Sequence, residues 1–270
     1  MKRFTVDKEI DLKSFIAEKL NISKKKAKEI IDSKNVFVND KRIWIATHRL
    51  KKGDKVEVNI KEANSENIKN RIIYEDKYII AVSKPPFVDS NQSKNSVENQ
   101  LRELKKDKNI EAIHRLDRET SGVLLFAKNR DIFEKFKDNW NEITDKKYLA
   151  IIHGNPKFSK KVIDSPIENK RAISEVRKLS TNGEFSLVEI KIPTGRKHQI
   201  RIHLAREGYP IVGDKIYGLK RIDNRLIKNI TRHMLHSREI ELFHPFLKKK
   251  IRIKAPLERD FKELKEKLKL

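Results

Sequence analysis

The hydrophobic pattern of the N-terminal region predicts a small unit of helices and strands. Apolar residues recur at helical spacing over residues 12–20 and again after Ser23, a residue type that favours the N-cap of a helix. Short extended runs separated by turn residues then continue to Val58. We therefore expect two helices and a hairpin-like sheet to form a compact unit over residues 1–62.

A polar stretch separates this unit from a longer region of mixed pattern. Residues 63–70 have no apolar periodicity and predict a linker. Beyond them, strand-like runs alternate with helical patterns, and a stretch rich in Lys and Pro follows Gly154. A helix with an apolar stripe closes the chain. This pattern predicts an α+β domain over residues 71–270.

The composition favours a polyanionic partner. The 270 residues include 63 Lys or Arg and 39 Asp or Glu, a formal net charge of +24. Because neutralising phosphates releases counterions, such an excess favours RNA or DNA. Aromatic residues make up only 7%, so base stacking must rely on a few placed rings or on arginine planes. The RNA-binding residues that we expect are four lysines on the second helix: Lys24, Lys25, Lys26 and Lys28.

The absence of cysteine and of long apolar segments limits the kinds of site and the cellular location that we expect. The chain has no cysteine, which excludes disulfides, thiolate metal sites and a cysteine nucleophile, and suits a reducing cytoplasm. No apolar run approaches the length of a membrane span, and no signal-like core follows the first residues. We therefore expect a cytoplasmic protein with no membrane contact.

One polar turn leads directly into an apolar run. Residues 114–122 read His-Arg-Leu-Asp-Arg-Glu-Thr-Ser-Gly, and Val-Leu-Leu-Phe-Ala follows. Asp117 lies between Arg115 and Arg118, and cationic neighbours keep a carboxylate ionised and ready to act as nucleophile or base. A structural turn with solvated charges is the alternative interpretation.

Four separated segments of residues 71–262 resemble the RluA-type pseudouridine synthases, in the order in which that family has them. Residues 114–122 match the H-R-L-D-x-x-T-S-G motif, and residues 194–201 read Thr-Gly-Arg-Lys-His-Gln-Ile-Arg. The third segment is Tyr148-Leu149-Ala150, and the fourth is Leu235-His236 with Phe243-His244-Pro245 beyond it. The supporting motif positions are His114, Leu116, Thr120, Gly122, Arg196, His198, Gln199 and Leu235.

The chain departs from the family pattern at two places. Pro86-Phe87 replaces a glycine-containing turn after Lys84-Pro85, and Lys197 stands where the family most often has threonine. The N-terminal unit resembles a second family, the S-four RNA-binding domain, in its helix pair and in residues 36–39 and 50–56.

The first resemblance implies a fold with a mixed, mainly antiparallel central sheet and a base-isomerising reaction. The bond between ribose and uracil nitrogen breaks, the base turns, and it rejoins through carbon 5, so no cofactor and no metal is required. Asp117 is implied as the catalytic carboxylate and Arg201 as its ion-pair partner. Tyr148 is implied to lie against the uracil, and Arg115 to fill the space that the extruded base leaves.

Two other functions use the same residues. His114, His198, His203 and His236 could join Asp117 in a His-based RNA-cleaving or metal enzyme, although their spacing fits no standard metal motif. A non-catalytic RNA-binding or ribosome-assembly protein that retains the fold is the second alternative. We expect a monomer that acts on large-subunit ribosomal RNA, with transfer RNA as the other substrate class.

Overall fold

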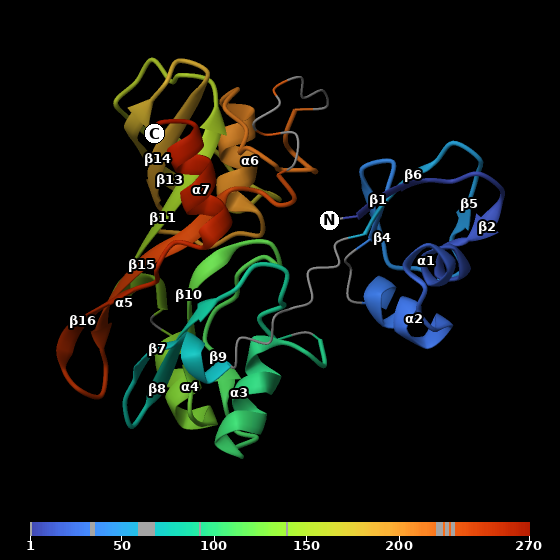
Figure 1. The fold of residues 1–270 in the computed structure, drawn as a ribbon. Coiled ribbons are helices and arrows are strands. Elements are labelled where there is room, and N and C mark those ends of the chain that lie inside the picture. Colours follow the sequence, from blue (N-terminus) through green and yellow to red (C-terminus); the bar gives the residue numbers. More distant parts are fainter. Residues whose placement is uncertain are drawn as a thin grey trace. The chain divides into compact units, whose positions relative to one another are not determined.

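The computed structural model divides the chain into two compact units, Met1–Ser65 and Glu66–Leu270 (Figure 1). The residues that it describes are 2–32, 36–58, 68–91, 93–138, 140–219, 224, 227 and 230–270. None of the described helices is long and apolar enough to cross a membrane.

The first unit packs two helices against small antiparallel sheets. Its elements are β1 (Lys2–Thr5), β2 (Ile10–Asp11), α1 (Leu12–Leu20), α2 (Lys24–Asp32), β3 (Val36–Val38), β4 (Lys41–Ile43), β5 (Arg49–Leu50) and β6 (Lys55–Val58). The larger sheet has the strand order β1-β6-β3-β4, and β2 pairs with β5. Phe15 and Ile16 of α1 and Ile31 of α2 are fully or almost fully buried in its core.

Side-chain caps explain where the two helices begin. The Asp11 carboxylate accepts a hydrogen bond from the Ser14 N–H at 3.0 Å, and the Ser23 hydroxyl accepts one from the Lys26 N–H at 3.2 Å. The predicted helix pair is therefore present at its expected positions. Strand β1 was not predicted, because Phe4 is its one large apolar residue and its neighbours are exposed.

The second unit is a large sheet with helices on both faces (Figure 1). Its elements are η1 (Ile68–Arg71), β7 (Ile72–Glu75), β8 (Ile79–Lys84), α3 (Val97–Lys105), β9 (Glu111–Ala112), β10 (Ser121–Ala127), α4 (Arg130–Lys137), α5 (Trp140–Ile143), β11 (Thr144–His153), β12 (Lys160–Asp164), β13 (Ile173–Thr181), β14 (Phe185–Lys191), α6 (Gln199–Arg206), β15 (Leu235–His244), β16 (Lys249–Lys254) and α7 (Arg259–Lys267). The strand order is β12-β13-β14-β11-β15-β10-β8-β7, with β16 on β15 and β9 on β10.

The sheet is mixed and mainly antiparallel, which confirms the predicted fold class. Among the described strands, β10 and β15 alone pair in parallel, through Ser121 with His236 and Gly122 with Ser237. Strand β8 is buried on both faces: Ile79 lies in one core cluster with Phe136 of α4, and Ile80 lies in the other with Phe261 of α7. Burial on both faces explains the continuous apolar runs of the central strands.

Two local expectations need correction, and one segment for which no element was expected forms strands. The Lys-rich and Pro-rich segment contains β12, in which only Ile163 is buried, and β13, in which buried Ser174 and Val176 alternate with exposed charged residues. The sequence from Arg196 to Ala205 predicts one helix, but the helix begins at Gln199, because His198 has a left-handed φ of 56°. Ile68 is buried within η1, so residues 68–70 of the expected linker are structured, while residues 63–67 lie outside the described residues.

Candidate active site

Asp117 stands in the loop between β9 and β10, and backbone contacts hold that loop in place. The Ser90 hydroxyl donates to the Leu116 carbonyl and accepts from the Leu116 N–H, both at 3.0 Å. The Thr120 N–H donates to the Asp117 carbonyl at 3.0 Å. With its neighbours fixed in this way, the Asp117 carboxylate keeps 29% of its side chain exposed and can meet a substrate.

A buried lysine ties this loop to the end of β8. The Lys84 ammonium donates to the carbonyls of Pro85, Val88 and Arg118 at 2.9, 2.8 and 3.1 Å. Burial, reinforced by the charge of Arg118, lowers the pKa of Lys84 to about 7. Phe87 has a φ of 68°, the left-handed conformation that glycine favours, and its N–H donates to the Arg118 carbonyl at 2.7 Å. The Pro86-Phe87 departure therefore keeps a glycine-like turn.

Three motif positions join β10 to the segment around β15. Thr120 hydrogen-bonds His233 at 2.8 Å, and Ser121 hydrogen-bonds Nδ1 of His236 at 2.9 Å. Gly122 has a φ of 114°, and a Cβ there would lie 2.1 Å from the Ser237 carbonyl oxygen. Only glycine therefore allows β10 to approach β15 this closely.

The histidines of the motifs serve as structural links. Burial lowers the pKa values of His114 and His236 to about 3, so both are neutral at physiological pH. The His114 ring stacks on Trp140, with ring centroids 5.0 Å apart, and His203 bonds Ser174 at 2.9 Å. Among the described residues, no three His, Cys, Asp or Glu side chains come together as metal ligands. This arrangement gives the His-based nuclease alternative no support.

The ion pair expected between Asp117 and Arg201 is present. Nη1 of Arg201, on α6, lies 3.2 Å from Oδ2 of Asp117. The other two nitrogens of the guanidinium bind Asp214, with Nε to Oδ2 at 2.6 Å and Nη2 to Oδ1 at 2.8 Å. Although burial alone would raise it, the Arg201 hydrogen bonds and charge lower the pKa of Asp214. Arg201 is thus a cation shared by two carboxylates.

His198 forms a hydrogen bond with Tyr217 and also lies close to Asp117. Nδ1 of His198 and the Tyr217 hydroxyl are 3.1 Å apart, and Nε2 of His198 lies 3.7 Å from Oδ1 of Asp117. Burial lowers the pKa of His198. The Arg201 guanidinium carbon lies 5.1 Å from the centroid of the Tyr217 ring, a cation–π distance. The surroundings of Asp117 therefore include the Arg201 cation and a histidine that favours its neutral form.

Tyr148 lies on β11, opposite Ser237 in the ladder with β15, and is 6% exposed. Burial raises the pKa of Tyr148 to about 12, and the charge of Asp117 acts in the same direction while Ser237 opposes it. Its hydroxyl therefore stays protonated at neutral pH and lies within electrostatic range of Asp117. The fold brings the three residues of the implied catalytic set into one region.

The remaining predicted residues fall into two groups. The Arg115 side chain is exposed and makes no hydrogen bond or ion pair with any described residue, whereas Leu116 and Leu235 are buried. The Gln199 amide donates to the Ile173 carbonyl at 2.7 Å and accepts from the Arg196 N–H at 3.0 Å. Gln199 thus fixes the turn that precedes α6, and Arg115 is available to a ligand.

The four predicted lysines lie in the first unit. All are exposed on α2, whose buried side is formed by Ala27 and Ile31: Lys24, Lys25, Lys26 and Lys28. Lys26 forms an exposed ion pair with Glu29 at 3.4 Å, a contact that solvent and salt screen strongly. A solvated, strongly basic helix face is what the sequence pattern indicated.

Sequence reasoning missed Asp214 and Tyr217. The sequence from Tyr209 to Asp214 predicts a turn, and neither Asp214 nor Tyr217 belongs to the four segments that carry the family resemblance. The available signal was a single carboxylate following Ile211, Val212 and Gly213, because an acidic residue beside an apolar run usually has a buried partner. Asp214 is 5% exposed and also accepts the Ile216 and Tyr217 N–H groups.

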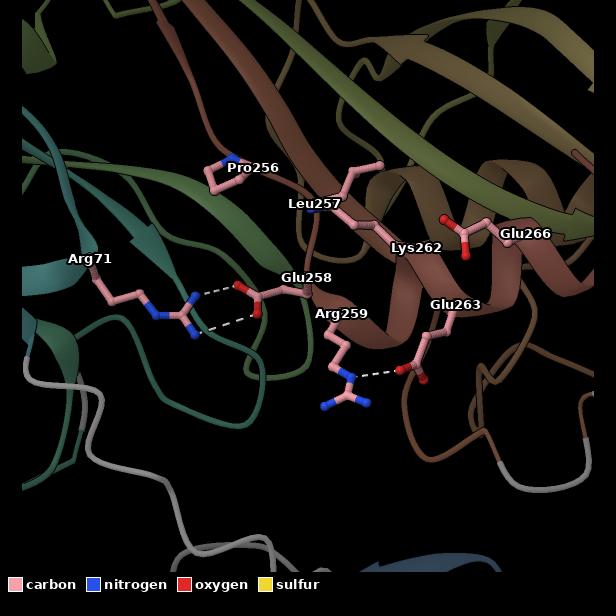
Figure 2. A pocket seen from close by; sticks show the side chains of 8 residues that line it. All are labelled: Arg71, Pro256, Leu257, Glu258, Arg259, Lys262, Glu263 and Glu266. Atoms are coloured by element: carbon pink, nitrogen blue, oxygen red, sulfur yellow. Dashed lines mark hydrogen bonds and ion pairs between the residues drawn. The ribbon is translucent and has the colours of Figure 1, made fainter.

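A separate pocket lies beside α7 (Figure 2). Four of its six charged lining residues form two pairs: Arg71 binds Glu258 at 2.5 Å, and Arg259 binds Glu263 at 2.6 Å. Pro256, Leu257, Lys262 and Glu266 complete the lining. None of these residues belongs to the motifs, so the pocket is distinct from the surroundings of Asp117.

Comparison with known proteins finds similar sequences over most of the chain. A family model described as RNA pseudouridylate synthase matches residues 78–206. The ribosomal large subunit pseudouridine synthase C of Buchnera aphidicola subsp. Baizongia pistaciae is 35% identical, over 87% of this chain and 85% of the relative. The protein of the same name from Vibrio cholerae is 31% identical, over 88% and 86%.

A solved structure is also similar. Human RNA Pseudouridylate Synthase Domain Containing 4 superimposes with a TM-score of 0.65, covering 76% of this chain and 95% of that chain. The two sequences are 22% identical, so this likeness concerns the fold alone.

Proposed function

The chain belongs to the RluA-type family of RNA pseudouridine synthases, and on that basis we propose that it modifies uridine in large-subunit ribosomal RNA. The Buchnera and Vibrio relatives are both named as ribosomal large subunit pseudouridine synthases, which supports this substrate class. The net charge of +24 favours binding to a large polyanion such as ribosomal RNA. We further propose that the enzyme acts as a monomer in the cytoplasm, the compartment that a cysteine-free chain suits.

Asp117 acts as the catalytic carboxylate in this proposal. The reaction breaks the bond between C1′ of the ribose and N1 of uracil, turns the base, and forms a bond from C1′ to C5. An ionised carboxylate is needed against the ribose–uracil unit, to attack it or to remove a proton. The single observation that carries this role is the pairing of an accessible Asp117 with Arg201 at 3.2 Å, because the fixed guanidinium orients the carboxylate while leaving it open to a substrate.

Tyr148 and Arg115 act on the base. The Tyr148 ring lies against the uracil, and its hydroxyl handles the proton at C5 once the new bond has formed. Its raised pKa, about 12, keeps the hydroxyl protonated in the resting site, so it accepts the proton from C5 only as it gives its own proton to water or to N1 of the turned base, which gains one proton in the reaction. The exposed Arg115 fills the space that the extruded uridine leaves, with its guanidinium plane stacked in place of the base.

The first unit provides affinity for the RNA. We assign it to the S-four type on its resemblance to that domain, and its exposed lysines on α2 contact phosphates. A ribosome-assembly protein without activity would have no use for the set of Asp117, Tyr148 and Arg201 around one point.

The test uses RNA transcribed with uridine that is tritiated at carbon 5. Ribosomal and transfer RNA are incubated separately with the full chain in EDTA, and the released tritium and RNA integrity are measured. We expect release from large-subunit ribosomal RNA, with intact strands and little release from transfer RNA. Release from transfer RNA alone would contradict the proposed substrate class, and strand cleavage would contradict the reaction.

A further inference from the structure

Two adjacent large apolar residues of the first unit face solvent. Trp44 and Ile45 are each 56% exposed. The other aromatic residues described in this unit are Phe4, which is half-buried, and Phe15 and Phe37, which are buried. Tryptophan is usually largely buried in a folded protein, so an exposed one beside an exposed isoleucine indicates a contact surface.

The segment that carries these residues is anchored. It connects β4 to β5 and crosses the start of α1. The Leu12 N–H donates to the His48 carbonyl at 2.8 Å, and the Lys13 N–H donates to the Ala46 carbonyl at 3.1 Å. These are N–H groups of the first turn of α1, which have no partner within the helix, so the loop caps the helix with its own carbonyls. The Trp44 segment is therefore a fixed part of the surface.

Cationic residues lie near the start of α1, where this segment is anchored. Asp11 is the N-cap of α1, and Arg49 lies opposite it in the β2–β5 ladder with an exposed side chain. Although partial burial opposes the change, the Ser14 N–H and the charges of Lys13 and Lys24 lower the pKa of Asp11. Both lysines therefore lie near the same end of α1 as the Trp44 segment.

The net charge of the unit selects between a nucleic acid and a protein as the occupant. Residues 1–62 contain 17 Lys or Arg against 10 Asp or Glu, a net charge of +7. A second copy of the chain carries +24, so Coulomb repulsion opposes self-association through this surface. A polyanion with exposed aromatic faces satisfies both the charge and the apolar surface, and unpaired nucleotides of RNA have that combination.

We propose that Trp44, supported by Ile45, is a base-stacking position for an unpaired nucleotide of the RNA substrate, next to phosphate contacts from the lysines at the start of α2. The inference rests on the proposed function, since it concerns how the same RNA is held. It adds a preference for single-stranded or looped RNA that lysines alone do not give, because a paired base cannot offer its face to a side chain.

Fluorescence tests the contact directly. The chain has two tryptophans, so Trp140→Phe leaves Trp44 as the single one. This variant is titrated with a stem-loop RNA that has an unpaired uridine-rich loop, and with the fully paired duplex of the same length. We expect the stem-loop to quench the Trp44 emission and the duplex to leave it nearly unchanged.

Affinity supplies the second measurement. In the full chain, Trp44→Ala should weaken stem-loop binding about tenfold, the size of one stacked base, and Trp44→Phe should recover part of the loss. The slope of log affinity against log salt should stay the same, because stacking releases no counterions. Val162→Ala removes a comparably exposed apolar side chain from the second unit, at 63% exposure, and should leave binding unchanged.

Stem-loop binding with wild-type affinity by Trp44→Ala, together with unquenched Trp44 emission, would overturn the stacking proposal while leaving the proposed function intact. A change in sedimentation on Trp44→Ala without any change in RNA binding would assign the surface to self-association instead. If the wild-type chain bound no RNA even at low salt, the proposed function would fail, and this inference with it.

Discussion

Arg201 and Asp214 form a two-point ion pair, with Nε and Nη2 of the guanidinium 2.6 and 2.8 Å from the two carboxylate oxygens. Only Nη1 is left for Asp117, at 3.2 Å. Because two nitrogens are already fixed, the guanidinium plane has one orientation, and the third nitrogen is presented to Asp117 without further ordering. Asp214 is therefore a positioning residue for the catalytic pair that we propose.

The Asp214–Arg201 pair predicts a joint loss of stability and rate. Asp214→Asn leaves the buried Arg201 guanidinium without its main counter-charge, so the free energy of unfolding should fall by about 3 kcal/mol. A guanidinium displaced from Asp117 should slow turnover about 100-fold. Denaturant unfolding and single-turnover tritium release measure the two effects. Glu189→Gln breaks a pair with the exposed Arg177 and should cost less than about 1 kcal/mol. Equal behaviour of the two variants would contradict the assignment.

Gly122 and Gly183 offer a matched comparison. Both have a positive φ, of 114° and 93°, but a Cβ at Gly183 meets no atom within 4 Å. Gly183→Ala should therefore cost about 1 kcal/mol, the strain of a left-handed conformation in a residue with a side chain. Gly122→Ala adds overlap with the Ser237 carbonyl and should cost at least about twice as much, since β10 must move away from β15. Similar denaturation midpoints for Gly122→Ala and Gly183→Ala would show that β10 can move away from β15 at little cost in stability.

His236 predicts a loss of stability in mild acid. Burial lowers its pKa from 6.5 to about 3, so between these values the unfolded chain binds one proton more than the folded chain. Stability from this group is complete above pH 6.5 and falls by about 1.4 kcal/mol per pH unit below it. His236→Gln should flatten the pH dependence of unfolding, followed by Trp140 emission in a Trp44→Phe background. Parallel curves for the two proteins would argue against a neutral buried His236.

The lysines of α2 predict a change in salt dependence. Replacing Lys24, Lys25 and Lys26 by Gln should weaken RNA binding and reduce the slope of log affinity against log salt by about 0.7 to 0.9 for each phosphate that is no longer neutralised. Replacing Lys262, Lys267 and Lys269, which are exposed on or just after α7, removes the same charge elsewhere. Filter binding at several salt concentrations compares the two triple variants. An equal slope change in both would reduce the role of α2 to net charge alone.

Local patterns were sufficient for most of the elements and not for the site. The caps at Asp11 and Ser23 and the apolar run of β10 are readable because they depend on neighbours in the chain. Asp117 and Arg201 are 84 residues apart, and no pattern of spacing pairs them. Their pairing was expected through resemblance to a known family.

Asp214 illustrates why some site residues and strands were not predicted from the sequence. It lies 13 residues from Arg201, on the far side of a turn, and becomes a partner only when that turn folds back over α6. The same reason applies to β12, whose exposed lysines mask a strand that is defined by pairing with β13. Both the Asp214–Arg201 pair and strand β12 depend on contacts between segments that a local sequence pattern does not reveal.

The role of Asp117 is tested most directly by single-turnover tritium release. Wild-type chain and Asp117→Asn, each in excess over RNA tritiated at uridine carbon 5, are compared for release rate and for RNA affinity. We predict that release by Asp117→Asn falls at least about 1,000-fold while affinity stays within about threefold, because the amide keeps the shape of the side chain but cannot serve as the ionised group. Release within about tenfold of wild type would remove Asp117 from the catalytic role and contradict the account.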